Sequence, residues 1–354
     1  MRARPPLKAR HGKGSQLPRS SGRIVAMQEQ GQVSLKQRFL NLRTLPWFAL
    51  AFALIAFFIF RLDVDLSATW ARIRAVNPFL YLLAFLVYYA SFPLRAWRWK
   101  LLLENAGFEP SHIPGLRRLT SILLINFFAN CLLPLRLGDV YRPYLLKEDT
   151  GASYPRALGT VLAERVLDLA TVLVLLIISG IGLWRQGGSF LYVLAIGLAL
   201  VGLGALFLGA MGRFGTRLSR FLPSRLRSLY LPFQEGTLGS FRQLLPVALQ
   251  GLGIWALETG RLYLVALALG IHPSPFLLLF AAQALALVVA IPFTPAGLGL
   301  VEAGVAGVLM TALPKEEAWS VSLVDRTISF LSLIAVGLIF FAFRQLSRAR
   351  ARRE

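Results

Sequence analysis

The sequence predicts an all-α, polytopic membrane protein, and three observations lead to that fold class. The chain has 354 residues, of which 56% are hydrophobic and 16% are charged, and its mean hydropathy is +0.62. Apolar runs of about twenty residues, the length that crosses a bilayer core, recur along it. The basic residues behind the net charge of +21 lie mostly in the two tails and in one loop. Such clustering is typical of the cytoplasmic flanks of membrane helices and argues against nucleic-acid binding.

The membrane segments follow a basic tail, residues 1–45, whose polar composition predicts disorder. Met1 and Met27 are both candidate start residues. The apolar segments are Pro46–Phe60, Pro78–Leu103, Leu119–Leu135, Ala157–Trp184, Phe190–Ala210, Leu244–Leu269, Pro275–Pro292, Ala296–Leu313 and Val321–Phe343. A second basic tail, residues 344–354, closes the chain.

The distribution of positive charge predicts which segments cross the membrane. Three basic regions favour the cytoplasm: the tail 1–45, the loop 211–243 and the tail 344–354. All three share that side only if the segment Leu119–Leu135 enters the membrane, breaks at Pro134–Gly138 and returns. We therefore expect a re-entrant hairpin there, in a plasma-membrane protein with both termini cytoplasmic.

A second hairpin is expected over Pro275–Leu313, which is broken at residues 292–299. The fold then has about six full spans and two broken hairpins, or eight spans if the hairpins are counted as crossings. Within the loop 211–243, the apolar residues of 212–230 can share one helical face with arginines on the other, which predicts an amphipathic helix over 212–230 lying on anionic lipid. The apolar residues are Phe214, Leu218, Phe221, Leu222, Leu226 and Leu229.

An internal repeat relates the two halves. In each half a proline is followed four residues later by a glycine, 30 residues later by an acidic residue and 31 residues later by an arginine. In the first half these residues are Pro134, Gly138, Glu164 and Arg165, and in the second half they are Pro295, Gly299, Asp325 and Arg326. Upstream, Arg98 precedes Gly107 by nine residues, as Arg261 precedes Gly270. The predicted topology makes the copies inverted, an architecture common among transporters. The first repeat spans 46–184 and the second 190–343, each with two helices, a hairpin and a third helix.

Charged residues inside the apolar runs are the candidate functional residues, because each needs a partner or water at membrane depth. Arginine suits phosphate through its planar fork of donors, and a half-helix beginning after Gly138 would add positive dipole. The alternative is that some of these charges form structural ion pairs, above all Arg95, Glu258 and Asp325. The expected headgroup-binding residues are Arg98, Asn130, Arg136, Asp139, Arg142, Glu164, Arg165 and Asp168 on one side and Thr294, Gly297, Glu302, Asp325 and Arg326 on the other.

Signals for an enzyme are weak. The three histidines, His11, His112 and His272, are scattered, and no phosphate-binding glycine loop or nucleophile with an evident base occurs, so we expect no metal and no cofactor. Cys131 is the single cysteine, so there is no internal disulfide.

Four stretches carry a family resemblance: Asn126–Asn130, Pro134–Pro143, Ala157–Asp168 and Pro292–Glu302. They resemble the flippase-like membrane domain of lysylphosphatidylglycerol synthases, over residues 46–343. The resemblance implies a role in moving a lipid between leaflets. Because the chain ends eleven residues after Phe343, we expect no synthase domain and no lysyl transfer.

The leading hypothesis is therefore a flippase-like transporter of a phospholipid or a lipid-linked headgroup, without a catalytic site. Two alternatives stay open. One is a membrane-embedded transferase acting on a lipid-linked sugar or an aminoacyl lipid, with Asp139 or Glu164 as base. The other is a non-catalytic membrane partner of a separate synthase or glycosyltransferase.

Overall fold

The computed structural model describes residues 65–183, 189–290 and 294–351. The predicted tail 1–45, the segment Pro46–Phe60 and part of the second break, residues 291–293, lie outside the described residues. Helices are the only regular elements in the described ranges, which confirms the all-α class there.

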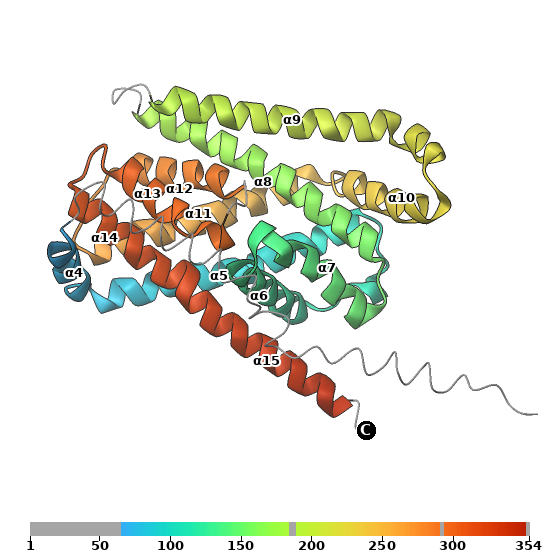
Figure 1. Cartoon of the computed structure of the whole chain (residues 1–354), viewed down its shortest axis with the longest axis horizontal. Coiled ribbons are helices and arrows are strands. Elements are labelled where there is room, and N and C mark those ends of the chain that lie inside the picture. Colours follow the sequence, from blue (N-terminus) through green and yellow to red (C-terminus); the bar gives the residue numbers. More distant parts are fainter. Residues whose placement is uncertain (1–64, 184–188, 291–293, 352–354) are drawn as a thin grey trace, which may run out of the picture. The chain divides into compact units, whose positions relative to one another are not determined.

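The α-helices are α4 (Leu66–Arg74), α5 (Pro78–Asn105), α6 (Leu116–Leu132), α7 (Leu137–Thr150), α8 (Tyr154–Leu183), α9 (Ser189–Leu218), α10 (Ser224–Gly239), α11 (Leu244–Ala268), α12 (Pro275–Ala290), α13 (Leu300–Leu309), α14 (Lys315–Arg326) and α15 (Leu333–Ala351) (Figure 1). Short helical turns link several of them. Local signals fix their ends: Asn77 caps α5, its side chain accepting from the amides of Phe79 and Leu80, and Gly151 ends α7 with φ +72°.

Four helical stretches in the described ranges are long and apolar enough to cross a membrane, which makes the chain a multi-pass membrane protein. They are Pro78–Asn105, Tyr154–Leu183, Leu194–Phe221 and Lys315–Arg348. Helix α11, which we also expected to span, is not among them, since polar residues such as Gln250, Glu258 and Arg261 interrupt its apolar sequence. Pro275–Leu287 and Pro295–Leu309 are shorter apolar helices.

Helices α6 and α7 fold back on each other around the first break. Helix α6 ends at Leu132, and the turn Pro134–Arg136 (η2) has two residues in the left-handed region, Leu135 at φ 58° and Arg136 at φ 50°. Near the open end, Arg118 of α6 donates to Asp149 of α7 at 2.8 Å. Left-handed backbone at two successive non-glycine residues is strained, and such strain persists only where the surroundings hold it.

The second break repeats this backbone pattern. The turn Pro295–Gly297 (η5) also has positive φ at the two residues after its proline, 47° at Ala296 and 68° at Gly297. Upstream of the two breaks, Gly107 and Gly270 are likewise left-handed, with φ 78° and 71°. The left-handed residues therefore fall at matching positions of the two repeats, except that Gly299 has φ 88° whereas its counterpart Gly138 lies in the first turn of α7.

The second helices of the two predicted repeats, α5 and α11, pack against each other. Their opposite ends meet, because the amide of Asn77 just before α5 donates to the carbonyl of Ala268 at the end of α11, at 2.7 Å. Midway along, Arg95 of α5 donates to Glu258 of α11 at 2.5 Å. A third contact fixes the end of α15, where Arg344 donates to Asp149 at 2.9 Å. Burial alone would raise the pKa of Asp149, but its hydrogen bonds from Arg118 and Arg344 outweigh burial and lower that pKa.

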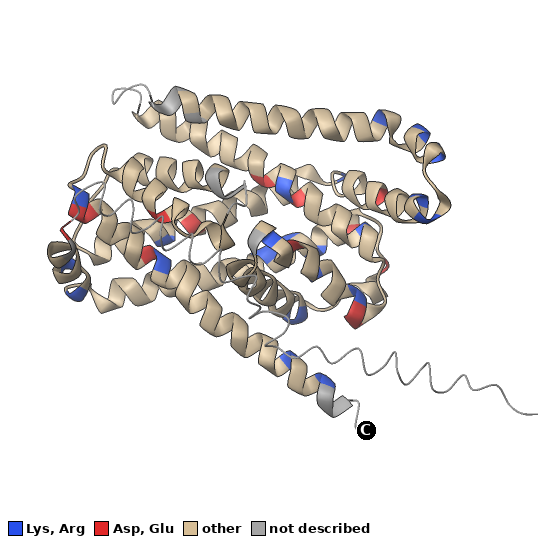
Figure 2. Cartoon of the chain, in the orientation of Figure 1, with Lys and Arg blue, Asp and Glu red and all other residues tan. Residues whose placement is uncertain are grey.

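The predicted amphipathic helix over residues 212–230 is wrong as a single element. Helix α9 continues to Leu218, a short turn (η4, Ser219–Phe221) follows, and α10 begins only at Ser224. Pro223 explains the interruption, because it has no amide hydrogen to continue a helix. Five of the six apolar residues are exposed, Phe221 with 86% of its surface, and Leu222 is half-buried. Figure 2 shows Lys and Arg residues gathered where α9 turns into α10.

Candidate functional site

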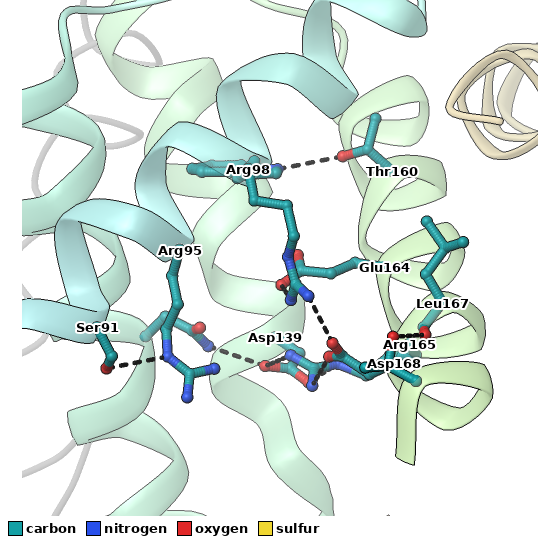
Figure 3. Close-up of polar contacts among 12 residues, drawn as sticks. Ser91, Arg95, Arg98, Asp139, Thr160, Glu164, Arg165, Leu167 and Asp168 are labelled. Atoms are coloured by element: carbon teal, nitrogen blue, oxygen red, sulfur yellow. Dashed lines mark hydrogen bonds and ion pairs between the residues drawn. The ribbon is translucent and has the colours of Figure 1, made fainter. Parts of the chain in front are cut away.

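Side chains from α5, α7, α8 and the first break converge on one ionic network inside the protein. We call it the first charged cluster, and it consists of Arg98, Arg136, Asp139, Arg142, Glu164, Arg165 and Asp168. Figure 3 shows Arg98 of α5 extending toward Glu164 and Asp168 of α8. The structure thus brings together every charged residue that the sequence predicts for the first side.

Glu164 holds the most buried part of the cluster. Its Oε1 accepts from Arg98 at 2.7 Å, and its Oε2 accepts from Arg142. Arg98 also donates to Asp168 at 2.7 Å. The side chains of Arg98 and Arg142 are only 1% exposed, and Arg142 lies over the ring of Trp99 with its guanidinium 4.9 Å from the ring centre. Ion pairs of this depth are costly to break singly, since the remaining charge is left without a partner.

Asp139 organises the outer part of the cluster, beside the break. Its Oδ1 accepts from the amides of Asn126 and Asn130, each at 3.1 Å. Its Oδ2 pairs with Arg136 and with Arg165, each at 3.2 Å. Asn126 was not among the predicted site residues. Its spacing of four from Asn130, which places both amides on one helical face, is the signal that would have found it.

Tight packing holds this outer part together. A methyl group added to Gly138, at the start of α7, would come within 2.1 Å of the carbonyl oxygen of Asn126 and 2.5 Å of the side chain of Asn130. Only glycine allows this approach of α7 to α6. The approach sets Asp139, the next residue, opposite the two amides.

The charge balance of the first charged cluster leaves it receptive to an anion. Four arginines against three carboxylates give a formal excess of one positive charge. The side chains of Arg136 and Arg165 are 27% exposed, whereas the other five members are at most 13% exposed. The excess charge therefore lies where an incoming ligand can reach it.

A second charged cluster is neutral overall and contacts the second break through Arg326 and Glu302. Its members are Arg95, Glu258, Arg261, Glu302, Asp325 and Arg326. Glu302 accepts from the amide of Gly299 and from Arg326, both at 2.6 Å, and Arg326 also donates to the carbonyl of Ala296 at 3.0 Å. Asp325 accepts from Arg261. Thr294 and Gly297 belong to the turn itself, where Thr294 donates to the carbonyl of Leu298 at 2.9 Å.

The second charged cluster fits the alternative of structural ion pairing better than the first. Arg261 forms ion pairs with both Asp325 and Glu258, and Glu258 also pairs with Arg95. The cluster therefore holds equal numbers of positive and negative charges. Among the residues that the structure describes, no group of three or more His, Cys, Asp or Glu side chains is arranged to hold a metal ion. Cys131 is buried.

Comparison with known proteins gives consistent matches. Residues 47–337 match the family model described as the lysylphosphatidylglycerol synthase TM region. A UPF0104 membrane protein of Methanocaldococcus jannaschii is 30% identical over 219 residues, which cover 60% of this chain and 93% of that protein. A UPF0104 membrane protein of Methanothermobacter thermautotrophicus is 25% identical over 84% of this chain and 93% of its own length. The glycosyltransferase AglD of Haloferax volcanii is 28% identical over 72% of this chain but only 46% of its own length.

Proposed function

The chain belongs to the lysylphosphatidylglycerol synthase transmembrane-region family, and from that premise we propose that it moves a phospholipid or lipid-linked headgroup between the leaflets of the plasma membrane. The observation that carries the proposal is the first charged cluster, which combines a helix break, burial and an excess positive charge. A helix broken at membrane depth is tolerated where it lines a cavity or a substrate path.

In this proposal α6 and α7 form a re-entrant hairpin whose tip is the first break. The pairing of Arg118 with Asp149 supports it, because the start of α6 and the end of α7 then lie on one side. Arg344 near the end of α15 joins the same two helices through Asp149. That side is the cytoplasm if the basic tail 344–354 follows the positive-inside rule.

The two repeats are inverted and related by a pseudo-two-fold axis between α5 and α11. Residues on such an axis meet their own counterparts. Arg98 and Arg261, matched by the repeat, are 163 positions apart, and the same offset carries Arg95 onto Glu258, its ion-pair partner. The matched backbone at the two breaks is further support. Rocking of one repeat against the other around these breaks would give access to the two sides in turn.

The headgroup exchanges partners with Asp139. A phosphate entering from the cytoplasmic side accepts hydrogen bonds from Arg136 and Arg165, whose planar forks match its oxygens. Asp139 then loses two cationic partners but keeps the amides of Asn126 and Asn130. The exchange leaves no buried carboxylate unpartnered, which keeps its cost low. On the opposite side, Arg326 would exchange its ion pair with Glu302 for the headgroup, and Glu302 would keep the amide of Gly299 as a partner.

A second candidate function is supported by the match to the glycosyltransferase AglD. The chain would then act on a lipid-linked sugar, either as a transferase or as the membrane partner of one. A transferase alters the lipid covalently, so mass spectrometry of lipids recovered from vesicles with and without the protein distinguishes it from a transporter. A membrane partner would instead be identified by co-purification with a synthase or glycosyltransferase.

The test of the proposal is lipid movement in proteoliposomes. A lipid with a fluorescent acyl chain is reduced by dithionite in the outer leaflet, and the slow phase reports its movement from the inner one. We expect the intact protein to accelerate that phase and Arg136→Ala and Glu164→Gln to abolish the acceleration. Arg117→Ala, which removes an exposed arginine at the start of α6, is the matched control and should retain it. Unchanged rates in both site variants would overturn the site.

A further inference from the structure

A cavity of about 480 Å³ lies apart from both charged clusters, where the end of α5, the start of α8, the end of α9 and α10 meet. Its polar lining is contributed by four elements. The residues that matter are Gly107, Arg156, Thr216, Gln234, Glu235 and Arg242. Most of the remaining lining is apolar, as in ligand sites that bind an amphipathic molecule.

The walls of the cavity are held by backbone packing. A methyl group on Gly236 of α10 would come within 2.0 Å of the carbonyl oxygen of Arg156 in α8. One on Gly159 of α8 would come within 2.3 Å of the carbonyl oxygen of Phe233. Glycine-mediated contacts of this kind bring membrane helices close together. The cavity therefore exists before any ligand arrives.

The polar groups in the cavity are left with unused hydrogen-bonding capacity. Gln234 is 5% exposed, and its amide nitrogen donates to the carbonyl of Met211 at 2.9 Å, which fixes its oxygen as an acceptor with no donor in the described part of the chain. Arg156 pairs with Glu235 at 2.6 Å, but its Nε is buried without a partner. Arg242 forms no ion pair with any described residue. Two arginines against one carboxylate leave the cavity positively charged.

The surroundings of the cavity indicate where its ligand comes from. The end of α9 and the following turn carry exposed apolar side chains, with Phe214 52%, Leu218 61% and Phe221 86% exposed. Lys and Arg residues of the same region lie among them (Figure 2). Exposed apolar and basic residues together are the signature of a surface that lies in the headgroup region of an anionic leaflet.

We propose that this cavity binds, as a resident ligand, an anionic phospholipid whose headgroup carries a hydroxyl. The phosphate is bound by Arg242 and Arg156, and the hydroxyl donates to the oxygen of Gln234. The phosphoryl group is the shared chemistry of such a lipid and of free phosphate, and the apolar rim selects the lipid. Arg156 precedes Glu164 by eight residues of α8, about 12 Å of helix, so the two sites are separate. This inference does not depend on lipid transport.

The test is lipid binding by the full-length protein in detergent, followed by native mass spectrometry with four probes: phosphatidylglycerol, phosphatidic acid, phosphatidylcholine and inorganic phosphate. We expect Arg242→Gln to weaken phosphatidylglycerol binding about tenfold or more, because a charge-assisted hydrogen bond is lost. The control variant Arg220→Gln removes one positive charge from the neighbouring turn η4, and it should change the affinity for phosphatidylglycerol by less than about twofold.

The headgroup hydroxyl is tested by Gln234→Met, which keeps the side-chain volume and removes both the acceptor oxygen and the amide that donates to Met211. We expect this variant to lose the preference for phosphatidylglycerol over phosphatidic acid, while thermal unfolding in lipid-free detergent checks that it folds. Equal losses of phosphatidylglycerol affinity in Arg242→Gln and Arg220→Gln would mean that any surface arginine contributes equally, and this would overturn the site. Displacement of the lipid by an equal concentration of inorganic phosphate would overturn the lipid as ligand. Flipping rates are not a readout here, so a failed transport proposal leaves this outcome unaffected.

Discussion

Glu164→Gln removes the carboxylate that two buried arginines share, and its cost follows from the geometry. Glu164 accepts from Arg98 at 2.7 Å and from Arg142, both arginines being 1% exposed. Glutamine keeps one acceptor oxygen but turns an N–H toward the other guanidinium. Removing one partner of a buried ion pair costs about 3–5 kcal/mol. Because Arg98 keeps Asp168, we expect the lower end, about 3 kcal/mol, or roughly a hundredfold in the folding equilibrium.

Equilibrium unfolding in mixed detergent micelles measures this loss, followed by tryptophan fluorescence. The matched control is Glu317→Gln, which removes a carboxylate from an ion pair with Arg72 at 3.1 Å whose side chains are 21% and 42% exposed. Exposed pairs contribute less than about 1 kcal/mol, so the control should unfold near the wild-type midpoint. Equal shifts for the two variants would refute the argument that Glu164 neutralises a buried pair of arginines.

Three further predictions concern the frame that holds the site. Exchanging the charges of Arg95 and Glu258 should restore much of the thermal stability that Arg95→Glu or Glu258→Arg loses alone, since the proposed pseudo-two-fold axis makes the two positions equivalent; a double variant no better than the worse single one would contradict the proposed axis. Gly236→Ala should lower the unfolding free energy by about 1–3 kcal/mol, because its new methyl group would meet a carbonyl oxygen of α8 at 2.0 Å. Gly209→Ala, whose methyl group would meet no atom within 4 Å, should not lower it. Equal unfolding midpoints for the two variants would refute the packing argument. Because the pKa of Asp149 is lowered in the folded protein, Asp149 contributes stability that is complete above the ordinary aspartate pKa of about 3.9 and is lost as the pH falls below it. Acidification from pH 7 to 3 should therefore lower the unfolding temperature of the wild type more than that of Asp149→Asn. Equal decreases in the two proteins would exclude Asp149 as a cause of acid destabilisation.

The sequence identifies the charged residues of the site because charges are rare in apolar segments and each stands out there. Arg98 lies on a different segment from Glu164 and Asp168, and the structure joins all three. The proline and glycine of the first break mark where α6 ends, although the left-handed backbone falls on Leu135 and Arg136, which glycine preference alone would not select.

Which partner each charge takes could not be predicted from the sequence. Arg95 and Arg98 are one helical turn apart, yet Arg98 pairs with α8 and Arg95 with Glu258 of α11. Spacing along a helix defines a face, and the neighbour of that face depends on tertiary packing. The same limit explains why Asn126 was not predicted as a site residue. Its side chain is buried, and its partner Asp139 lies on α7, an element that the sequence places only approximately.

The amphipathic pattern over residues 212–230 shows a different failure. Its apolar positions fit a helical period, but Pro223 divides it, so one face is shared between the end of α9 and the start of α10. Periodicity describes side chains, whereas a missing backbone donor decides whether the helix continues. Five of the six apolar residues remain exposed after the division, so the pattern still marks an exposed apolar surface.

The most direct test of the central proposal is photolabelling by two phosphatidylglycerol analogues, one with a diazirine in the headgroup and one with it at the end of an acyl chain. The proposal predicts that the headgroup analogue labels the peptide containing Leu135, which is 63% exposed beside Arg136, and that Arg136→Ala reduces this labelling severalfold. The acyl-chain analogue should label the lipid-facing side of α9, where Leu206 is 70% exposed, in both proteins alike. A break peptide that the headgroup analogue leaves unlabelled, or labels equally in Arg136→Ala, would contradict a lipid headgroup at the first charged cluster.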